Sequence, residues 1–591
     1  MTGGRDTIPA GANAPTPPSR GREGSPWQEY FGQDERALRG LAAIGLAWII
    51  MLWAVVAYAD CPEAAFPAFY TQPDVFEAGL AASEDVNPVD GIGGAILPHH
   101  LEMPELLAGA VRMVARPGVR RVVILFPDHF YKSRVPFATT GRGFQTIFGP
   151  IPGDAAAASS LLGDGLVEES CLFQDDHGVR AVLPFMARLM PGVAVVPVAV
   201  SINSTRDQWE AMAVRLRPLV GADTVVLQVT DFSHYLPLHQ ARLRDQQVLN
   251  VLAAMDRDAV AGLVQPDHVD SVGAMYLAMT LMGQRGLRPV VVANANMQGL
   301  YRRFIPETTS YVVAAFVPDG GDAPPFAGAE RFLIGGDLFL GRVLPEYLSD
   351  ELAARRVEEA ALAATKGLPL VLNLEGVLLP QLPRALDHMV LGMPADLLRD
   401  WAERLNIVAV SLANNHARDM GDSGLAETRR ALRQLGIPFV GQGDVIRLNG
   451  AALVGLSDLD GRAMPSVDRL TPDLLDRAMI GDAAVPVIAL LHWGREFVTV
   501  PSARERWIAE NLRGRGVAAI VGAHPHQTSH SPRVIGGGDT VVVQSVGNFL
   551  FDQLPPAASG SLVEVRVFPQ GTVFLRQLPL PSLFAAALGE R

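Results

Sequence analysis

Apolar runs rich in valine, isoleucine and leucine alternate with helical stretches along most of this chain. Examples are RRVVILF at 120–126 and AVPVIALLH at 484–492, and PELLAGAVRMVAR at 104–116 has the period of a helix. Strands that are apolar on both faces, with helices between them, are typical of βαβ units in parallel or mixed sheets. The pattern therefore predicts an α/β protein.

The chain is too long for one core, because a domain usually holds about 100–200 residues and the sequence has 591. The apolar pattern stops at DGGDAPPFAGA, residues 319–329, where Gly and Pro crowd together. We therefore expect two domains, at 60–318 and 331–580, joined by a linker at 319–330. Residues 581–591 are assigned to a C-terminal tail.

Composition excludes several classes of protein. Hydrophobic residues make up 49% of the chain and charged residues 19%, unlike a disordered protein. The net charge of −13 argues against a nucleic-acid partner. With only Cys61 and Cys171, a disulfide scaffold or a Cys-rich zinc site is excluded, and one disulfide stays open.

The N-terminal segment predicts a membrane anchor. Residues 1–37 read as a disordered tail, and Gly40–Ala59 are 20 residues without a charge. At about 1.5 Å per residue such a helix spans roughly 30 Å, the thickness of a bilayer core. We therefore expect one transmembrane helix at 38–59.

The basic residues beside this run set its expected orientation. Arg36 and Arg39 precede it, and no further Lys or Arg appears until Arg112. The positive-inside rule then leaves the tail in the cytoplasm and places the bulk of the protein in the periplasm or outside the cell. A cleaved signal peptide is the alternative, because Ala57-Tyr58-Ala59 fits an A-x-A site. The long tail and long apolar run favour the single-pass anchor.

Ligand-type side chains follow several apolar runs of the C-terminal half. In chain order they are Asp337, Glu375, Asn414, Asn415, His416, His492, His524 and His526. Sites in open α/β sheets form beyond the carboxyl ends of the strands, so we expect these residues to meet at one edge. Imidazoles and carboxylates suit divalent Zn, Mn or Fe. A helix cap at NNH or an exposed turn at HPH would explain single elements, and their coincidence favours a metal site.

These residues belong to motifs that resemble a known family. The motifs are GDLFLGR at 336–342, NLEG at 373–376, ANNHA at 413–417 with Asp419 and Gly421, HWG at 492–494 with Glu496, GAHPH at 522–526 and SVGNFLFD at 545–552. Together, over about residues 331–580, they resemble the CapA family of capsule or poly-γ-glutamate synthesis proteins.

The resemblance implies a calcineurin-like metallophosphoesterase fold with two metals bridged by a carboxylate. By position, the implied metal ligands are Asp337, Glu375, Asn415, His492, His524 and His526. His416 would be the general acid, and Arg342 and Arg495 would hold an anionic substrate. One departure is Phe339, which stands where typical phosphoesterases of this fold carry a second histidine.

Histidine motifs also recur in the N-terminal half. They are LPHH at 97–100, FPDH at 126–129, DHG at 176–178 followed by LPF at 183–185, and DFSHY at 231–235. Single histidines in turns are ordinary, but this set and its order resemble the Memo family, including AmmeMemoRadiSam system protein B. The resemblance covers about residues 85–318.

The Memo resemblance implies the fold of class III extradiol dioxygenases, which use non-haem iron. His99 and His129 would be metal-site residues, Asp231 and His234 would line the same pocket, and His177 would lie nearby. The family's Cys-Gly pair reads Val272-Gly273 here, so no thiolate is available at that position. A single metal bound through imidazoles, or a binding module without catalysis, are both open.

The expected function is that of a membrane-anchored protein of capsule, poly-γ-glutamate or other envelope polymer metabolism. Its C-terminal domain would be a metal-dependent hydrolase of phosphoesterase type, with two Mn, Fe or Zn ions and an anionic polymer or phosphoester as substrate. One alternative is a protein that grips a polyanion through metal without turnover. Another is that the Memo-like half is the active oxidoreductase or modification component, partnered with a radical SAM enzyme.

Overall fold

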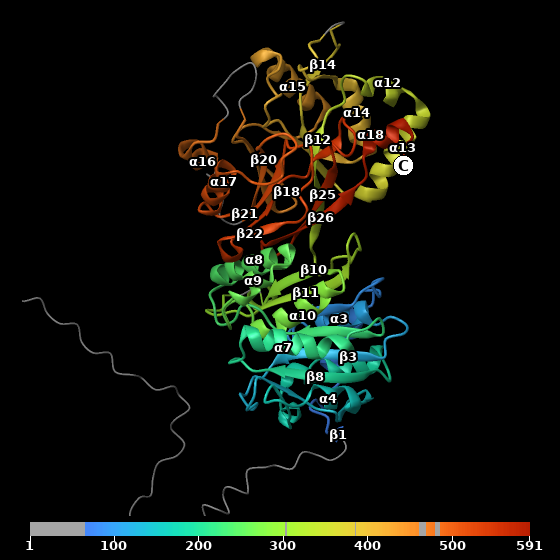
Figure 1. The fold of residues 1–591 in the computed structure, drawn as a ribbon, viewed down its shortest axis with the longest axis vertical. Helices are drawn as coiled ribbons and strands as arrows, with labels where there is room; N and C mark the ends of the chain where they lie inside the picture. Colours follow the sequence, from blue (N-terminus) through green and yellow to red (C-terminus); the bar gives the residue numbers. More distant parts are fainter. Residues whose placement is uncertain (1–64, 302–303, 384–385, 460–468, 479–484, 591) are drawn as a thin grey trace, which may run out of the picture. The chain divides into compact units, whose positions relative to one another are not determined.

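The computed structural model describes residues 65–301, 304–383, 386–459, 469–478 and 485–590. Contacts divide the chain into two units, residues 1–60 and 61–591. The first unit lies entirely outside the described residues. The second unit contains an N-terminal half (residues 65–318) and a C-terminal half (residues 330–590), and both are mixed α/β, as the apolar runs predict (Figure 1).

The predicted transmembrane architecture requires correction. No helix among the residues that the structure describes is long and apolar enough to cross a bilayer. Residues 38–59, on which that prediction rests, lie outside the described residues. The single-pass fold class and the localisation derived from it are therefore not supported, and we withdraw both.

An eight-stranded sheet organises the N-terminal half. Its strand order is β10-β11-β2-β9-β3-β8-β4-β7. The strands are β2 (Gly94–Leu97), β3 (Arg121–Pro127), β4 (Phe137–Thr139), β7 (Val167–Glu169), β8 (Ala194–Val200), β9 (Thr224–Val229), β10 (Leu287–Asn296) and β11 (Ser310–Pro318). The central strands β2, β9, β3 and β8 are parallel, so their carboxyl ends share one edge.

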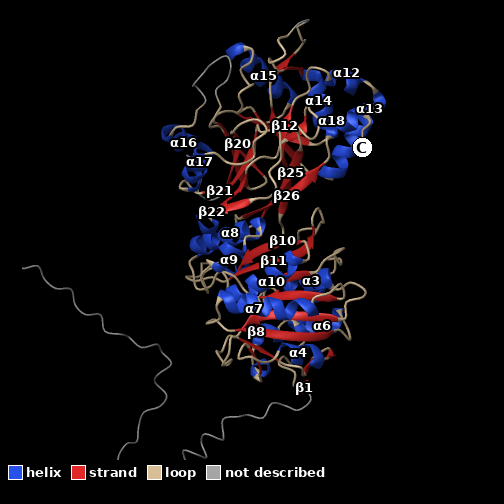
Figure 2. Cartoon of the chain, in the orientation of Figure 1, coloured by secondary structure: helices blue, strands red, loops and turns tan. Residues whose placement is uncertain are grey.

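Helices cover both faces of this sheet (Figure 2). Alternate residues of β3 point to opposite faces, so Ile124 joins one apolar core and Leu125 the other. The first core includes α3 (Pro104–Val114) and α6 (Leu183–Leu189), and the second includes α7 (Arg206–Leu216), α8 (Leu238–Ala254) and α10 (Val272–Gln284). This is a three-layer α/β/α arrangement.

Short elements complete the N-terminal half. They are β1 (Ala65–Phe66), β5 (Gly143–Thr146), β6 (Gly149–Ile151), α2 (Asp74–Ala82), α4 (Ala155–Leu161), α5 (His177–Arg180), α9 (Arg257–Ala261) and α11 (Met297–Tyr301). Cys171, which precedes a short 3-10 turn, is disulfide-bonded. The only other cysteine in the sequence is Cys61, which lies outside the described residues.

Two sheets stack face to face in the C-terminal half. The first has the order β17-β16-β13-β12-β25-β26, with β24 also paired to β12, and the second has the order β18-β19-β20-β21-β23-β22. The first contains β12 (Glu330–Leu338), β13 (Leu370–Leu374), β16 (Ile407–Ser411), β17 (Phe439–Val440), β24 (Asn548–Leu550), β25 (Gly560–Val567) and β26 (Val573–Leu580). The second contains β18 (Val445–Leu448), β19 (Ala451–Ser457), β20 (Val487–His492), β21 (Val517–Ala523), β22 (Arg533–Ile535) and β23 (Thr540–Val543).

An apolar core fills the space between these two sheets. Phe332 and Val371 of the first sheet share it with Ile488 and Val521 of the second. The outer faces carry α12 (Leu344–Ser349), α13 (Glu351–Thr365), α14 (Ala395–Arg404), α15 (Gly421–Leu435) and α18 (Leu583–Leu588) on one side, and α16 (Pro472–Ala478) and α17 (Ala503–Arg513) on the other. A small pair, β14 (Val377–Leu379) and β15 (Gly392–Pro394), stands beside the first sheet. Residues 581–591, assigned above to a tail, thus include α18, whose Leu583 and Ala587 are buried.

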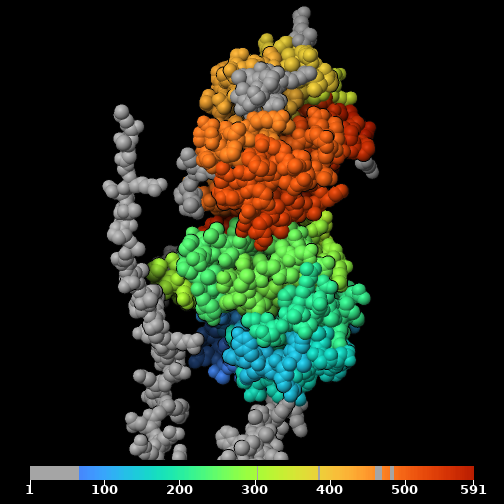
Figure 3. All heavy atoms as spheres, turned by 60° about the vertical axis from the view of Figure 1, so that its left-hand side comes forward, coloured from blue at the N-terminus to red at the C-terminus, as the bar shows by residue number. Residues whose placement is uncertain are grey.

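Helix α8 connects the two halves by hydrogen bonds from two side-chain amides. Asn250 donates through Nδ2 to the carbonyl oxygens of Gly538 (2.8 Å) and Ala518 (3.3 Å). Gln246 pairs with both backbone groups of Val573, at 2.8 Å each. In Figure 3 the green residues of this region abut the orange and red residues of the C-terminal half. These two amides therefore find their hydrogen-bond partners across the seam, as buried polar groups require.

Candidate functional site

Strand ends from both sheets of the C-terminal half deliver the predicted ligands to one place. Asp337 lies in β12 and Glu375 directly follows β13, while His492 ends β20 and His524 follows β21. Asp337 Oδ1 is 3.8 Å from His492 Nδ1, and Glu375 Oε1 is 3.7 Å from His492 Nε2. All four residues are buried. Parallel strands bring their carboxyl ends to a common edge, and here two such edges meet.

Two overlapping groups of possible metal ligands result. Glu375, His492 and His524 form one, and Asp337, Glu375 and His526 form the other, each with ligand atoms within 4.8 Å of one another. Glu375 belongs to both groups. A carboxylate has two oxygens that can each accept a ligand bond, so Glu375 is placed to bridge two ions. The described residues thus contain candidate metal-binding groups at the predicted positions.

Backbone geometry turns the GAHPH segment inward. His524 and His526 have φ angles of +95° and +56°, which residues with a Cβ adopt at a cost of about 1–3 kcal/mol each. The turn lets His524 donate its backbone N–H to Asp337 Oδ2 (3.3 Å), while His526 Nδ1 lies 3.3 Å from the same carboxylate. The strained turn therefore wraps around Asp337.

A glycine allows the close approach beneath Asp337. A side chain at Gly336 would collide with the carbonyl oxygen of Gly547. That oxygen accepts the backbone N–H of Asp337 at 3.1 Å. Gly336 therefore lets β12 and the segment before β24 lie close enough to fix the position of Asp337.

Asn415 and His416 sit at the border of the two groups. Asn415 Oδ1 accepts from His492 Nε2 at 2.9 Å. His416 Nε2 is 3.8 Å from Glu375 Oε1, and His416 Nδ1 is 2.7 Å from Asp419 Oδ2. Its side chain is 11% exposed, so His416 lies between the buried ligands and the surface.

The predicted arginines lie outside this cluster. The Arg342 guanidinium stacks over the rings of Phe339 (5.0 Å) and Phe551 (5.4 Å) and is 3.5 Å from Asp552. Phe551 also contacts His526, with ring centres 5.0 Å apart. Arg342 is therefore one aromatic ring removed from the histidines, and Arg495 is exposed.

Electrostatics divide the C-terminal residues into two protonation classes. Burial lowers the pKa of His524 to about 4 and that of His492 well below its usual value. Burial and the charge of Asp337 raise the pKa of Glu375 to about 8. Burial also works against a charged His526, but its bond to Asp337 and the charge of Glu375 outweigh it and raise its pKa to about 9. Burial therefore favours the neutral forms of His492 and His524, whereas Glu375 and His526 keep their protons to a higher pH than usual.

The N-terminal half gathers a second cluster at the carboxyl ends of β2 and β3. His99 Nε2 and His129 Nε2 are 3.2 Å apart, and the ring of His177 lies 4.2 Å from that of His129. His99, His129 and His177 form one possible ligand group, and His99, His100 and Asp231 form another. His234 lies at the side, with its ring 6.0 Å from that of His100.

Several polar residues around both clusters had no role in the sequence-based prediction. Asn373 donates to Asp337 Oδ1 (2.8 Å), and Asn548 Oδ1 is 2.7 Å from His526 Nδ1. Asp176 Oδ1 is 2.7 Å from His129 Nδ1, and Asp270 Oδ2 is 3.5 Å from His99 Nε2. Asn373 and Asn548 stand inside recognised motifs, so position was a usable signal for them. Asp176 also stands inside a motif, DHG at 176–178, whereas Asp270 comes from a segment remote from the histidine that it contacts.

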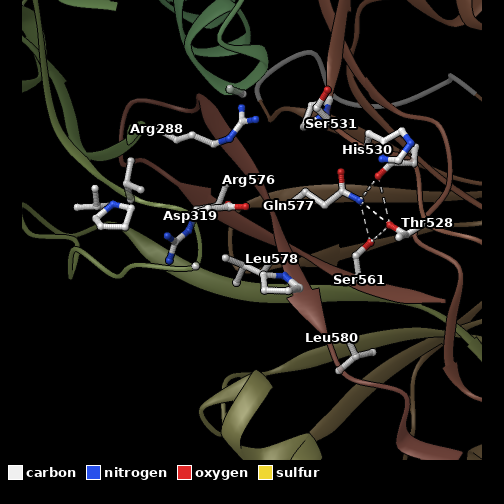
Figure 4. Close-up of a pocket in the computed structure, with 18 of the residues that line it drawn as sticks. Arg288, Asp319, Thr528, His530, Ser531, Ser561, Arg576, Gln577, Leu578 and Leu580 are labelled. Atoms are coloured by element: carbon white, nitrogen blue, oxygen red, sulfur yellow. Dashed lines mark hydrogen bonds between the residues drawn. The ribbon is translucent and has the colours of Figure 1, made fainter. Parts of the chain in front are cut away.

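A pocket of about 280 Å³ lies at the seam of the two halves and contains none of the predicted site residues (Figure 4). Gln577 Nε2 donates there to Thr528 Oγ1 (2.7 Å) and Ser561 Oγ (2.9 Å). The pocket is therefore distinct from both ligand clusters.

Comparison with known proteins supports a two-part description. Residues 87–297 match the family model of Memo-like protein, and residues 331–454 and 469–553 match that of bacterial capsule synthesis protein PGA_cap. The PGA biosynthesis protein CapA of Bacillus subtilis is 31% identical over 170 residues, which are 25% of this chain and 44% of the relative. The capsule biosynthesis protein CapA of Bacillus anthracis is 29% identical over 196 residues, covering 29% and 47%.

The N-terminal half has relatives of its own. A MEMO1 family protein of Methanopyrus kandleri is 25% identical over 203 residues, which are 33% of this chain and 71% of the relative. The matches to the two CapA proteins span less than half the length of those relatives. Both predicted resemblances are confirmed, each for its own half of the chain.

Proposed function

We propose that this chain, which joins a Memo-like half to a CapA-like half, acts in capsule or poly-γ-glutamate metabolism, with a metal-dependent hydrolase of phosphoester type in its CapA-like half. The names of the two CapA relatives support the biological setting. The chemistry is supported by one observation above all: two groups of buried ligands share Glu375. Burying five ionisable side chains at this edge of the sheets costs free energy. A purely structural role would not require that cost, so the cluster supports a functional site.

The donor set fits divalent metal ions. Glu375 Oε2 and His524 Nδ1 are buried and have no hydrogen-bond partner, which is unusual for buried polar atoms unless a ligand completes them. Carboxylate oxygens and imidazole nitrogens, without thiolates, suit Mn, Fe or Zn. When bound between these residues, such ions supply Lewis-acid activation of a water and neutralise charge on a phosphoryl-like centre.

His416 is placed to act as the general acid. Burial lowers its pKa, but the bond to Asp419 and the charge of Glu375 outweigh this and raise the pKa above its usual value. A protonated imidazole at the border of the cluster can donate from Nε2 to a leaving oxygen, while Asp419 holds Nδ1. This is the role that the CapA resemblance implies for His416.

The substrate class that fits is anionic. Arg342 and Arg495 are the nearby cations predicted to hold it, and Arg342 is oriented by its stacking on Phe339 and Phe551. Phe339 is fully buried and packs against Phe551 with ring centres 5.2 Å apart. Position 339 therefore contributes an aromatic ring that packs against Phe551 rather than a metal ligand.

The test measures metal content and turnover in the full-length chain. Bound Mn, Fe and Zn are measured by elemental analysis, and hydrolysis of an aryl phosphodiester is assayed after reconstitution with each ion. For a hydrolase, His524→Ala loses metal and activity together, whereas His416→Ala keeps metal and loses activity. The two variants separate metal holding from proton donation.

Two results would contradict the hydrolase. A chain that stays free of metal under saturating supplementation removes the basis of the proposal. Metal-dependent binding of an anionic polymer such as poly-γ-glutamate, undiminished in His416→Ala and without turnover in any variant, would instead support a protein that grips the polymer.

A further inference from the structure

We propose that the Memo-like half holds a divalent metal ion between His99, His129 and Asp270, with Asp270 as the anionic ligand in place of the cysteine that the Memo resemblance would require. This site is separate from the CapA-like cluster and does not depend on the function proposed for it. Val272, which occupies the place of that cysteine, is buried in the apolar core on the face of α7 and α10. Its side chain offers no ligand atom.

The distances between the three side chains match a shared ion. Two ligands about 2.1 Å from one ion, separated by 90–109°, lie roughly 3.0–3.4 Å apart. His99 Nε2 and His129 Nε2 are 3.2 Å apart. Asp270 Oδ2 is 3.5 Å from His99 Nε2 and 4.0 Å from His129 Nε2, wider spacings that the same ion accommodates at ligand–metal–ligand angles above about 109°. The three atoms thus surround a single point from three sides.

The surrounding contacts hold these ligands in place. Asp176 Oδ1 lies 2.7 Å from His129 Nδ1 and leaves Nε2 to face the other two ligands. A carboxylate behind a ligating imidazole in this way fixes the tautomer of the ring. Asp231 accepts the backbone N–H of His99 (3.0 Å) and donates its own N–H to Asp270 Oδ2 (3.0 Å).

An unpartnered atom points to a ligand at this place. Asp270 Oδ1 is buried and has no hydrogen-bond partner, and the side chain as a whole is only 10% exposed. A buried carboxylate oxygen left without a partner is costly, and a cation would offset that cost. His177, whose ring centre lies 4.2 Å from that of His129, is available as a fourth ligand.

The donor set determines the class of metal. Two imidazole nitrogens and one carboxylate oxygen, with other positions open, suit Fe²⁺ or Mn²⁺, whereas a thiolate would favour softer ions such as Cu⁺. The substitution of Val272 for cysteine therefore changes the preferred ion rather than abolishing the site.

Cobalt provides a spectroscopic probe for the experiment, because bound Co²⁺ has visible d–d bands. The full-length chain carries Glu375→Gln throughout, which removes the ligand shared by both CapA-like groups. Co²⁺ is then titrated into this chain and into versions with Asp270→Asn or Asp267→Asn. Asp267 is the matched control, since it carries the same charge in the same loop three residues earlier.

The expected result is a fall in Co²⁺ affinity of at least tenfold for Asp270→Asn and no more than twofold for Asp267→Asn. Unchanged binding by Asp270→Asn, or an equal loss in both variants, would overturn the proposal. If Asp270→Asn does not fold, Asp270→Glu decides instead. A lost ion or shifted d–d bands in that folded variant supports Asp270 as a ligand, and bands identical to those of the parent contradict it.

Discussion

Glu375 Oε1 lies 3.7 Å from His492 Nε2 although Glu375 follows β13 of one sheet and His492 ends β20 of the other. This contact lies at the edge of the apolar core between the two sheets. Stacking of the sheets and assembly of the ligand cluster are therefore one event, and the ligands cannot meet unless the core between β13 and β20 is formed.

Glu375→Gln should remove the capacity of the CapA-like half for both of its ions. A neutral amide is a weak ligand, and this residue belongs to both groups, so we expect a loss of affinity of about 100-fold or more at each group. Elemental analysis after dialysis against a weak chelator measures it. Glu496→Gln is the control, because Glu496 is an exposed acid near Glu375. Equal metal content in the Glu375→Gln chain and the parent would contradict the bridging role.

Metal uptake by the CapA-like half should release protons and strengthen as the pH rises. Glu375 and His526 have pKa values raised to about 8 and about 9 in the metal-free protein, so near pH 7 both hold protons that an ion must displace. Affinity should therefore increase between about pH 6 and pH 9. Calorimetry in two buffers of different ionisation enthalpy counts the protons, and a count of zero at pH 7 would rule out this account.

Asp419→Asn should alter the pH profile of hydrolysis more than the metal content. Asp419 stabilises the protonated form of His416, so its removal lowers that pKa. A general acid acts when protonated, and the basic limb of the kcat profile should therefore move to lower pH. His416→Ala should lower kcat by about 100-fold or more with metal retained. A basic limb that stays in place in Asp419→Asn would argue against His416 as the acid.

Asp322→Asn should destabilise the chain at neutral pH. Asp322 contacts Arg331 (3.3 Å), Arg576 (3.1 Å) and Lys366 (3.1 Å). Burial opposes its charge, but these cations outweigh burial and lower its pKa to about 2. A carboxylate with a depressed pKa stabilises the fold above its unfolded pKa and loses that contribution as the pH falls toward 2.

The expected cost of Asp322→Asn at pH 7 is about 2 kcal/mol in the free energy of unfolding, at roughly 1.4 kcal/mol per pKa unit. Urea denaturation measures it, with the exposed neighbour Asp319→Asn as the control. The difference between Asp322→Asn and the parent should shrink below about pH 4. A cost that is the same at pH 3 and pH 7 would show that charge is not the cause.

The sequence predicted the strand ends of both halves better than the contacts around them. Asp337, Glu375, His492, His524 and His526 follow apolar runs that do form strands. Parallel strands of one sheet share an edge, so the ligands of each sheet were expected to lie together. The meeting of the two edges depends on how the sheets stack.

The missing parts depend on long-range geometry. Asp270 is 171 positions from His99 in the chain and yet contacts it, and this distance depends on where α10 begins relative to β2. No periodicity in the sequence indicates where α10 begins relative to β2. The predicted membrane helix at 38–59 rested on the length of the uncharged run at 40–59 alone, and these residues lie outside the ones that the structure describes.

Arg566 shows why these halves are unsuited to being expressed as separate modules. Its guanidinium is fully buried and donates to the carbonyl oxygens of Val291 (3.0 Å) in one half and Ala323 (2.8 Å) between them. Dividing the chain anywhere in 319–330 would leave Arg566 on one fragment without its acceptor at Val291. Asn250, on the other fragment, would lose its acceptors as well. The roles of the two halves are therefore better separated with point substitutions than with truncations.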